Sequence, residues 1–480
     1  MNIRFFSKLS IVTILLNTLW IPTIRAQSVL HASGNKIVDS LNLPVILRGV
    51  NLGGWLVTED WMCGILDSSD PEGRSARQSL EGIYTETQVN QLMNTWENNW
   101  ITAADIDTIR SLGFNFMRVP FGWRNLQYQN EQWCRDTSGK IDFSRFDWIV
   151  NQAAAHHMYV IFDFHVWLNQ NLDYSGISNV DSVILNACTI WKAVAGHFKN
   201  NPTVAAYDLL NEPTGSTHDT VMHIIYDTVR SVDPAHMIAL EGVNFDTARW
   251  HNVLYEDHWY GLTSANLQSN IAYFDSAYLP VLHKADSLKA PFYVGETQSP
   301  NDSSLAWSLN EYCLYQTNWS PWTYKTINQW GWGLLSFYPN HTAVNILTAP
   351  FDTILTKWSQ VSNTGNCYEL QDIKTIWSNG AKDNCSMSVI PTVEMQKSPL
   401  TVFPNPVQNS ITLLFNDALN NSSTIGITDL TGRLVSLIPT ATGTGVNNEV
   451  TLNVSGLAAG VYFVRVSSGQ LVYNAKFIKE

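Results

Sequence analysis

The chain has 480 residues, of which 45% are hydrophobic, and this length allows one large folded domain and a smaller one. Its formal net charge is −13 at neutral pH, which argues against nucleic acid or an anionic membrane surface as the partner. The 19 tryptophans offer flat apolar faces on which sugar rings stack, although large aromatic side chains also fill protein cores.

The first 26 residues have the pattern of a secretory signal. Arg4 and Lys8 precede an apolar stretch over residues 9–21, and Ala26 offers a small residue for cleavage. The stretch is too short for a stable membrane span, and no later run reaches the length that a bilayer requires. We therefore expect an exported mature chain in an oxidising space.

Residues 27–378 alternate between strand-like and helix-like stretches. A small hairpin is expected first, over Leu30 to Pro44. Apolar runs bounded by loop residues predict eight buried strands: Val45–Leu52, Phe114–Pro120, Tyr159–His165, Val204–Leu210, Met237–Gly242, Val253–Tyr260, Pro291–Glu296 and Asn318–Tyr324. Helices are predicted between them over Ile101–Leu112, Phe146–Met158, Asp181–Lys199, Asp219–Val232, Ile271–Leu288 and Ser304–Tyr315. This order predicts an α/β fold, a closed (β/α)8 TIM barrel of parallel strands. No glycine fingerprint for a dinucleotide follows the first strand, which disfavours a Rossmann fold.

The C-terminal part has a different composition, rich in Thr, Ser, Asn, Val and Gly. Short strands are predicted over Ser410–Phe415, Thr424–Asp429, Glu449–Val454 and Val461–Val466. We expect a small β-sandwich over residues 398–480, joined to the barrel by a polar linker at residues 379–397.

Six cysteines are too few for a disulfide scaffold, and no C-x-x-C spacing suggests a structural zinc site. Two pairs are open to bridging, and two cysteines in helical patterns are expected to be buried and free. The pairs are Cys63 with Cys134 and Cys367 with Cys385, and the free cysteines are Cys188 and Cys313.

Two glutamates, Glu212 and Glu296, each follow an apolar run. A carboxylate at the exit of a buried strand loses solvation unless something pairs with it. Two such groups facing each other have their pKa values pushed apart, which gives one acid and one base or nucleophile, as in a glycosidase.

Glu212 is the candidate acid, since Asn211 precedes it and Pro213 fixes the chain after it. Neighbouring strand residues point to opposite faces, so Asn211 and Glu212 both reach the site only if the strand has ended or bulged. Asn211 would then bind the sugar hydroxyl beside the reacting carbon.

Glu296 is the candidate nucleophile, and Gly295 before it would let a sugar ring approach the backbone. Arg118 and Tyr260 are expected to donate hydrogen bonds that keep Glu296 ionised. Arg118 would equally serve to neutralise a buried carboxylate, and both roles are compatible.

Further chemistry-bearing residues gather at the carboxyl ends of the strands, where barrels carry their active sites. At or near seven of the eight strand ends the sequence places Arg118, His165, Asn211 with Glu212, Glu241, His258 with Tyr260, Glu296 and Trp322. His165 and His258 are either metal ligands or hydrogen-bond partners of substrate and carboxylates, and without an H-E-x-x-H spacing we favour the second. Trp322 is either core or the floor of a sugar pocket. Lys325 is a Schiff-base lysine or, as we favour, a surface charge.

The motifs Asn211-Glu212-Pro213 and Gly295-Glu296 resemble glycoside hydrolase family 5, whose barrels carry an acid/base and a nucleophile on strands four and seven. Further matching motifs are Arg48 to Trp55, Arg118-Val-Pro120, Asp163-Phe-His165, His258-Trp-Tyr260 and Trp322-Thr-Tyr-Lys325, within roughly Leu30 to Ser362. The resemblance implies that Glu212 is the acid/base and Glu296 the nucleophile of a retaining enzyme. Arg118, His165, Asn211, His258, Tyr260 and Trp322 fall on the family's other active-site positions.

The stretch from Asn51 to Trp61 is particularly similar to the exo-β-1,3-glucanase branch of that family. In that branch the acid that matches Glu59 grips the terminal glucose, which implies a blind pocket. The chain departs from the branch after His165, where it continues Val-Trp-Leu-Asn-Gln in place of Gly-Ala-Pro-Gly. That loop shapes the pocket, so linkage and exo action stay open.

The last eighty or so residues resemble the C-terminal sorting domain of type IX secretion. The matching pieces are Phe403-Pro-Asn-Pro406, Asp429-Leu-Thr-Gly-Arg433, Leu457-Ala-Ala-Gly-Val-Tyr462 and Lys476-Phe-Ile-Lys479. The resemblance implies export through the periplasm to the cell surface or exterior by the type IX machinery. A carbohydrate-binding β-sandwich is the alternative, disfavoured by the few aromatics that the strand pattern exposes.

The sequence thus predicts a secreted retaining β-glycosidase of β-glucan, more an exo-β-1,3-glucanase than an endo-β-1,4-glucanase, with no metal or organic cofactor. The carboxyls of Glu212 and Glu296 are expected about 5–5.5 Å apart, as retention demands. The alternatives from other classes are a non-catalytic carbohydrate-binding protein on the same barrel and a metal-dependent hydrolase that uses His165 and His258.

Overall fold

The computed structural model describes residues 27–65, 76–168, 180–214, 218–262, 266–299, 302–327, 332–337, 344–362, 367–382, 400–415, 424–429, 434–439, 449–468 and 471–480. The predicted signal segment, residues 1–26, and most of the predicted linker lie outside these ranges, as does Cys385.

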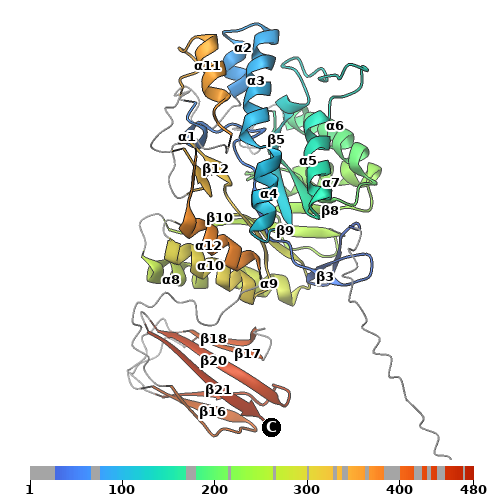
Figure 1. Cartoon of the computed structure of the whole chain (residues 1–480). Helices are drawn as coiled ribbons and strands as arrows, with labels where there is room; N and C mark the ends of the chain where they lie inside the picture. Colours follow the sequence, from blue (N-terminus) through green and yellow to red (C-terminus); the bar gives the residue numbers. More distant parts are fainter. Residues whose placement is uncertain are drawn as a thin grey trace, which may run out of the picture.

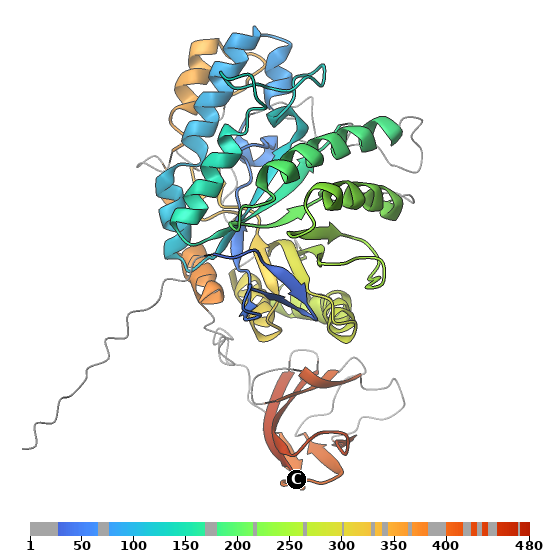
Figure 2. The same ribbon diagram turned by 90° about the vertical axis from the view of Figure 1, so that its right-hand side faces the viewer.

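Eight parallel strands form one sheet in chain order, and each predicted strand is present. They are β4 (Gly49–Asn51), β5 (Phe116–Gly122), β6 (Tyr159–Val166), β7 (Val204–Asp208), β8 (Met237–Glu241), β9 (Val253–Tyr260), β10 (Phe292–Gln298) and β11 (Asn318–Pro321). The sheet closes on itself because Arg48, just before β4, forms a parallel bridge with Trp319 of β11. The predicted barrel is therefore confirmed (Figures 1 and 2).

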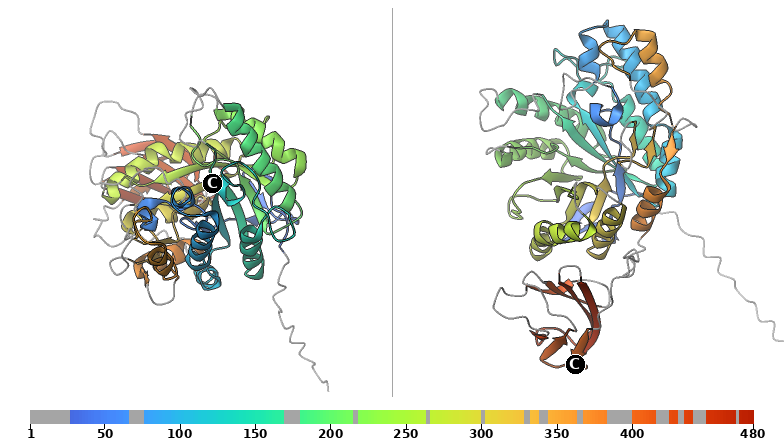
Figure 3. Two further views of the ribbon diagram at one scale, coloured as in Figure 1. Left: turned by 90° about the horizontal axis from the view of Figure 1, so that it is seen from above. Right: turned by 90° about the vertical axis from the view of Figure 1, so that its left-hand side faces the viewer.

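Helices surround the strands, as the view from above shows (Figure 3). Those that follow the predictions are α4 (Ala103–Ser111), α5 (Ser144–Ala155), α6 (Val180–Phe198), α7 (His218–Val232), α8 (Leu267–Ala277), α9 (Leu279–Ser287) and α10 (Asp302–Leu314). The single helix predicted over Ile271–Leu288 is divided into α8 and α9, because Pro280 lies in the first turn of α9 and has no N–H to continue the preceding helix. Residues 242–252, between β8 and β9, contain no helix.

Several helices escaped prediction. They are α1 (Asp60–Cys63), α2 (Ala76–Glu81), α3 (Glu86–Trp100), α11 (Phe351–Trp358) and α12 (Gln371–Ala381), with the 3₁₀ turn η1 (Trp123–Asn125). Helix α3 begins with a capping box at Thr85 and packs on α11 through Trp96, whose ring lies 5.1 Å from that of Trp358. Helix α12 extends to Ala381, so residues 379–381 of the predicted linker are helical.

The amino end of the barrel is covered by the predicted hairpin, β1 (His31–Ser33) with β2 (Lys36–Val38), to which β3 (Pro44–Val45) adds. Leu30 and Ile37 pack in one cluster with Phe116 and Met237 of the barrel interior. The Ala32 N–H donates to Asn252, directly before β9. With this end filled, the carboxyl ends of the strands are left for a site.

Two predictions about cysteines are wrong. Cys63, Cys134, Cys188 and Cys367 are free thiols, so neither proposed pair forms. Cys313, expected to be free, is disulfide-bonded. Strand and helix patterns fix neighbours along the chain but not which distant cysteines meet, which is why the pairing was not predicted.

The prediction that Lys325 is a surface charge is also wrong. Lys325 forms β12 (Lys325–Thr326) in a small sheet with β13 (Leu335–Ser336) and β14 (Tyr368–Glu369), and its side chain is fully buried. Its ammonium lies 3.3 Å from the Asp105 carboxylate and donates to the backbone oxygen of Trp100. Burial lowers the pKa of Lys325, and its role is to bridge segments that lie far apart in sequence.

The C-terminal residues form two antiparallel sheets around their own apolar cluster, and the four predicted strands are present. One sheet contains β15 (Thr401–Phe403), β16 (Ser410–Leu414) and β19 (Glu449–Asn453), and the other contains β18 (Leu434–Pro439), β17 (Thr424–Asp429), β20 (Gly460–Ser468) and β21 (Leu471–Lys479). Across the described part of the chain, no helix is both long and apolar enough to cross a membrane.

Candidate active site

The main chain turns sharply where it presents Asn211 and Glu212. Strand β7 ends at Asp208, and Glu212 has φ +46°, in the left-handed region that residues other than glycine rarely adopt. The condition that the strand must have ended is therefore met, and both side chains line the same cavity.

Arg118 of β5 is fully buried at the centre of this end of the barrel. Its Nη1 donates to Glu296 at 2.8 Å, its Nη2 donates to Asn211 at 2.9 Å, and its Nε donates to Asp208 at 2.9 Å. A further carboxylate, Asp163, lies 3.1 Å from Nη1. Burial alone would lower the pKa of the guanidinium, but these carboxylates raise it well above its ordinary value. Arg118 thus donates to the candidate nucleophile and also lies among other buried acids, so the contacts that both proposed roles require are present.

Glu296 of β10 is held through both carboxylate oxygens. Oε1 accepts from Arg118, and Oε2 accepts from the Tyr260 hydroxyl at 2.5 Å. These are the two donors predicted from the sequence. They hold the carboxylate in one position in the cavity wall, where Glu296 as a residue is 4% exposed.

Gly295, directly before Glu296, is required for a different reason from the predicted one. A Cβ on Gly295 would lie 1.7 Å from Oε1 of Glu256, a neighbour on β9. The missing side chain therefore makes room for the buried Glu256 and not for a sugar ring. Sequence reasoning did not single out Glu256, because one acid within an apolar strand carries no spacing signal.

His165 of β6 lies between two carboxylates. Its Nδ1 is 2.8 Å from Asp163 and its Nε2 is 3.3 Å from Glu59. The imidazole stacks on the Trp322 ring with centroids 5.1 Å apart and planes at 10°. Trp322 is 3% exposed, packs in the hydrophobic core and also lines the cavity, so it meets both of the alternatives expected for it.

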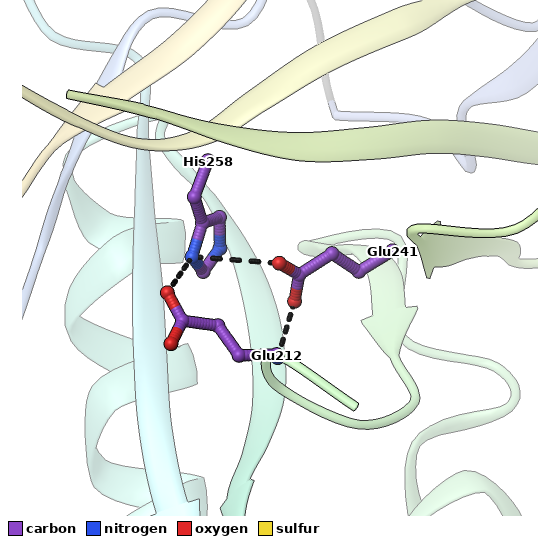
Figure 4. A group of neighbouring side chains, drawn as sticks. All are labelled: Glu212, Glu241 and His258. Carbon is purple, nitrogen blue, oxygen red and sulfur yellow. Dashed lines mark hydrogen bonds and ion pairs between the residues drawn. The ribbon is translucent and has the colours of Figure 1, made fainter. Parts of the chain in front are cut away.

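His258 of β9 connects the two candidate catalytic glutamates. Its Nδ1 lies 2.8 Å from Oε1 of Glu212 and 3.5 Å from Oε1 of Glu241 (Figure 4). The same nitrogen lies 3.6 Å from Oε2 of Glu296. Nε2 lies 3.7 Å from Glu256. Although burial alone would lower the pKa of this imidazole, Glu241 and Glu296 raise it well above its ordinary value. His258 is therefore a buried cation shared by several anions.

The charges of the glutamates differ from the expected pattern. The hydrogen bond from His258 lowers the pKa of Glu212 to about 2, the opposite of the raised value expected for an acid. Burial raises the pKa of Glu241 to about 8. These pKa shifts could not be predicted from the sequence, because they depend on burial and on one imidazole that contacts glutamates distant along the chain.

The cavity at this end of the barrel has a volume of about 380 Å³, within the range typical of small-ligand pockets. It is lined by Glu59, Trp61, His165, Asn211, Glu212, Tyr260, Gly261, Glu296, Gln298, Ser299, Trp322 and Trp332. Seven of the nine predicted site residues are among these, while Arg118 and His258 contact the lining carboxylates from within the barrel. Four lining residues were not predicted, Gly261, Gln298, Ser299 and Trp332, and Trp61 entered the prediction only as part of a motif.

The geometry also bears on the metal alternative. Within the described residues, the group whose ligand atoms approach closely enough to hold a metal ion is Glu212, Glu241 and His258, all within 4.8 Å of one another. His165 is not in this group, and both of its ring nitrogens face carboxylates. A metal site built on His165 and His258 therefore has no support in the arrangement.

These pKa values predict how stability depends on pH. Burial alone would lower the pKa of His165, but the charge of Asp163 raises it from 6.5 to about 10, so its contribution is complete below pH 6.5 and is lost as the pH rises through about 10. Glu241, with its pKa raised from 4.5 to about 8, favours the folded state less as the pH rises through that window. Glu212 acts in the opposite direction, but only as the pH falls from 4.5 toward about 2.

We therefore expect the thermal unfolding midpoint to be a few degrees higher near about pH 5.5 than near about pH 9. Differential scanning calorimetry measures both midpoints, and the difference between them should be smaller in a His165→Gln variant. Equal midpoints at the two pH values would contradict the proposed charge arrangement.

Comparison with known protein families gives two matches. Residues 79–335, a little more than half of the chain, match the model of Cellulase (glycosyl hydrolase family 5). Residues 401–480 match the Secretion system C-terminal sorting domain.

Curated relatives match the barrel region. A Beta-xylosidase of Phanerodontia chrysosporium is 27% identical over 258 residues, which is 48% of this chain and 52% of that protein. A Probable glucan 1,3-beta-glucosidase A of Aspergillus niger is 27% identical over 276 residues, 52% of this chain and 64% of that protein. The chain thus spans between about half and two thirds of the length of these relatives.

Among solved structures, Thermotoga maritima Cel5A in complex with cellobiose is 16% identical, with a TM-score of 0.43, over 65% of this chain and 96% of that one.

Proposed function

The chain belongs to glycosyl hydrolase family 5, and from this premise we propose that it is a retaining β-glucan hydrolase with Glu212 as acid/base and Glu296 as nucleophile. Its C-terminal sorting domain directs it to the cell surface or exterior through type IX secretion. We further propose that residues 1–26 are a cleaved signal, with the barrel over residues 27–381 to the end of α12, the linker over 382–397 and the sandwich over 398–480.

The observation that carries the proposal is that Glu212 and Glu296 face one cavity and one nitrogen. Nδ1 of His258 is 2.8 Å from the first carboxylate and 3.6 Å from the second. A sugar held between them has the candidate nucleophile Glu296 on one side and the carboxyl of Glu212 on the other. The Glu212 side chain is 58% exposed. In the proposed reaction Glu296 attacks the anomeric carbon and Glu212 protonates the leaving oxygen. Glu212 then deprotonates the water that releases the sugar.

Glu212 must acquire a proton before it acts as an acid. The bound sugar covers its exposed carboxylate, and this loss of solvation raises the pKa from its low value in the open pocket. The proton then passes from Nδ1 of His258 to Oε1 of Glu212 along their 2.8 Å hydrogen bond. His258 in this way supplies the proton that Glu212 gives to the leaving oxygen.

Two features favour action at a chain end with β-1,3 linkages. Glu59 lines the cavity beside His165, and the Trp61 indole N–H donates to it, so a fixed carboxylate is available for the hydroxyls of a terminal sugar. Trp61 and Trp332 form an edge-to-face pair at 5.2 Å in the cavity wall. The curated relatives named glucan 1,3-beta-glucosidase support the same specificity.

Product analysis on laminarin, cellulose, mixed-linkage glucan, xylan and mannan tests the proposal. We expect glucose as the early product from laminarin, released first as the β-anomer in proton NMR, with no loss of activity after chelation. An oligomer ladder from cellulose would instead indicate an endo-β-1,4-glucanase. A first-formed α-anomer would exclude retention, and binding without turnover on any glycan would identify a carbohydrate-binding protein.

A further inference from the structure

We infer that Glu241 is a positioning residue for the acid/base Glu212, an inference that rests on the proposed function. Glu241 is the last residue of β8, 6% exposed, and it does not line the cavity. It therefore acts on the reaction only through the groups that it contacts.

The first of these contacts is with the main chain of Glu212. Oε2 of Glu241 accepts the Glu212 N–H at 2.5 Å (Figure 4). Glu212 has left strand β7 and has a φ of +46°, so no sheet ladder holds this peptide group. The bond from β8 fixes the conformation that aims the Glu212 side chain into the cavity.

The second contact is with the partner of the Glu212 side chain. Oε1 of Glu241 lies 3.5 Å from Nδ1 of His258, the atom that is 2.8 Å from the Glu212 carboxylate. One carboxyl thus contacts the backbone of the acid/base and the imidazole that donates to it. The other carboxyl groups that face His258, apart from that of Glu212, belong to Glu296 and Glu256.

Protonation of Glu241 fits this role. Because burial raises its pKa to about 8, Glu241 is largely neutral near neutral pH. A neutral carboxyl still accepts the Glu212 N–H, but it does not compete with Glu212 for the charge of His258. Length and direction of the side chain, more than its charge, are therefore what the site requires.

Three variants separate the position of the side chain from its carboxyl group. Glu241→Gln keeps the length and an acceptor oxygen, Glu241→Asp keeps the carboxyl group but is shorter, and Glu241→Leu keeps neither the acceptor oxygen nor the carboxyl group. Each is assayed on laminarin, whose leaving group needs a proton, and on 2,4-dinitrophenyl β-glucoside, whose leaving group does not. We expect Glu241→Asp and Glu241→Leu to lose roughly 10²-fold in kcat/KM on laminarin but only a few-fold on the dinitrophenyl substrate. Glu241→Gln should stay within a few-fold of the wild type on both.

Glu97→Gln is the matched control, because Glu97 is another buried glutamate whose pKa burial raises, and it pairs with Arg145 away from the cavity. It should leave the ratio between the two substrates unchanged. Equal losses on both substrates in the Glu241 variants, or an active Glu241→Asp with an impaired Glu241→Gln, would overturn the inference.

If Glu241→Leu fails to fold, the comparison of Glu241→Asp with Glu241→Gln still decides. The proposed function fails separately, and visibly, if the wild type turns over neither substrate, or if Glu212→Ala loses activity equally on both.

Discussion

Replacing Glu296 by alanine is expected to lower kcat on β-glucan by roughly 10⁴-fold or more, because the substitution removes the attacking oxygen. The fold should survive, since Arg118 keeps Asp163 and Asp208 as partners after Glu296 is lost. Steady-state kinetics on laminarin measure the loss, and circular dichroism reports the fold. Turnover within ten-fold of the wild type would contradict the assignment of the nucleophile.

Added azide separates the two glutamates by stereochemistry. In Glu296→Ala, azide takes the place of the missing nucleophile and should give the α-glucosyl azide from an activated β-glucoside. In Glu212→Ala the covalent intermediate still forms, so azide should give the β-glucosyl azide. Proton NMR distinguishes the products, and the same anomer from both variants would mean that the roles are assigned incorrectly.

The barrel could be predicted from the sequence because its signals are local. The run from Val204 to Leu210 is apolar except for Asp208, and strands buried on both faces are typically this apolar. The carboxyl ends of parallel strands meet at one edge, so Arg118, Glu212 and Glu296 could be placed together without knowledge of their contacts. Glu296 illustrates the agreement, because both of its predicted donors are present.

What could not be predicted depends on distant residues. Lys325 looks like a surface charge until Asp105 and the carbonyl of Trp100 are brought to it. The low pKa of Glu212 requires His258, and the need for Gly295 arises from Glu256 on the neighbouring strand. Helix α3 is a different case, because its buried Val89, Leu92, Met93, Trp96 and Trp100 recur at helical spacing. This local signal was present in the sequence, and the prediction did not use it.

Arg118 is the residue whose loss should most affect stability. The carboxylates of Asp163, Asp208, Glu256 and Glu296 all lie within 3.7 Å of its guanidinium, and the side chain is fully buried. Arg118→Met leaves these groups without their cation, and we expect a loss of about 3–5 kcal/mol in the free energy of unfolding at neutral pH. Arg118→Lys should recover part of the lost stability, because it restores a positive charge. The recovery should be incomplete, because one ammonium cannot reach all the positions that the planar guanidinium spans.

The loss should depend on pH in a definite direction. Without the guanidinium, these buried carboxylates keep, among the described residues, only His165 and His258 as neighbouring cations. They are relieved further by taking up protons, so the folded variant binds more protons than the unfolded chain. Its destabilisation relative to the wild type should therefore shrink as the pH falls from about 7 toward about 5. Urea unfolding at both pH values measures this. Arg145→Lys is the control, because it keeps a cation beside the buried Glu97 and the Arg145 side chain is 26% exposed, so stability should change by only about 0–1 kcal/mol. If Arg118→Met were as stable as this control at neutral pH, Arg118 could not be the cation that stabilises these four buried acids.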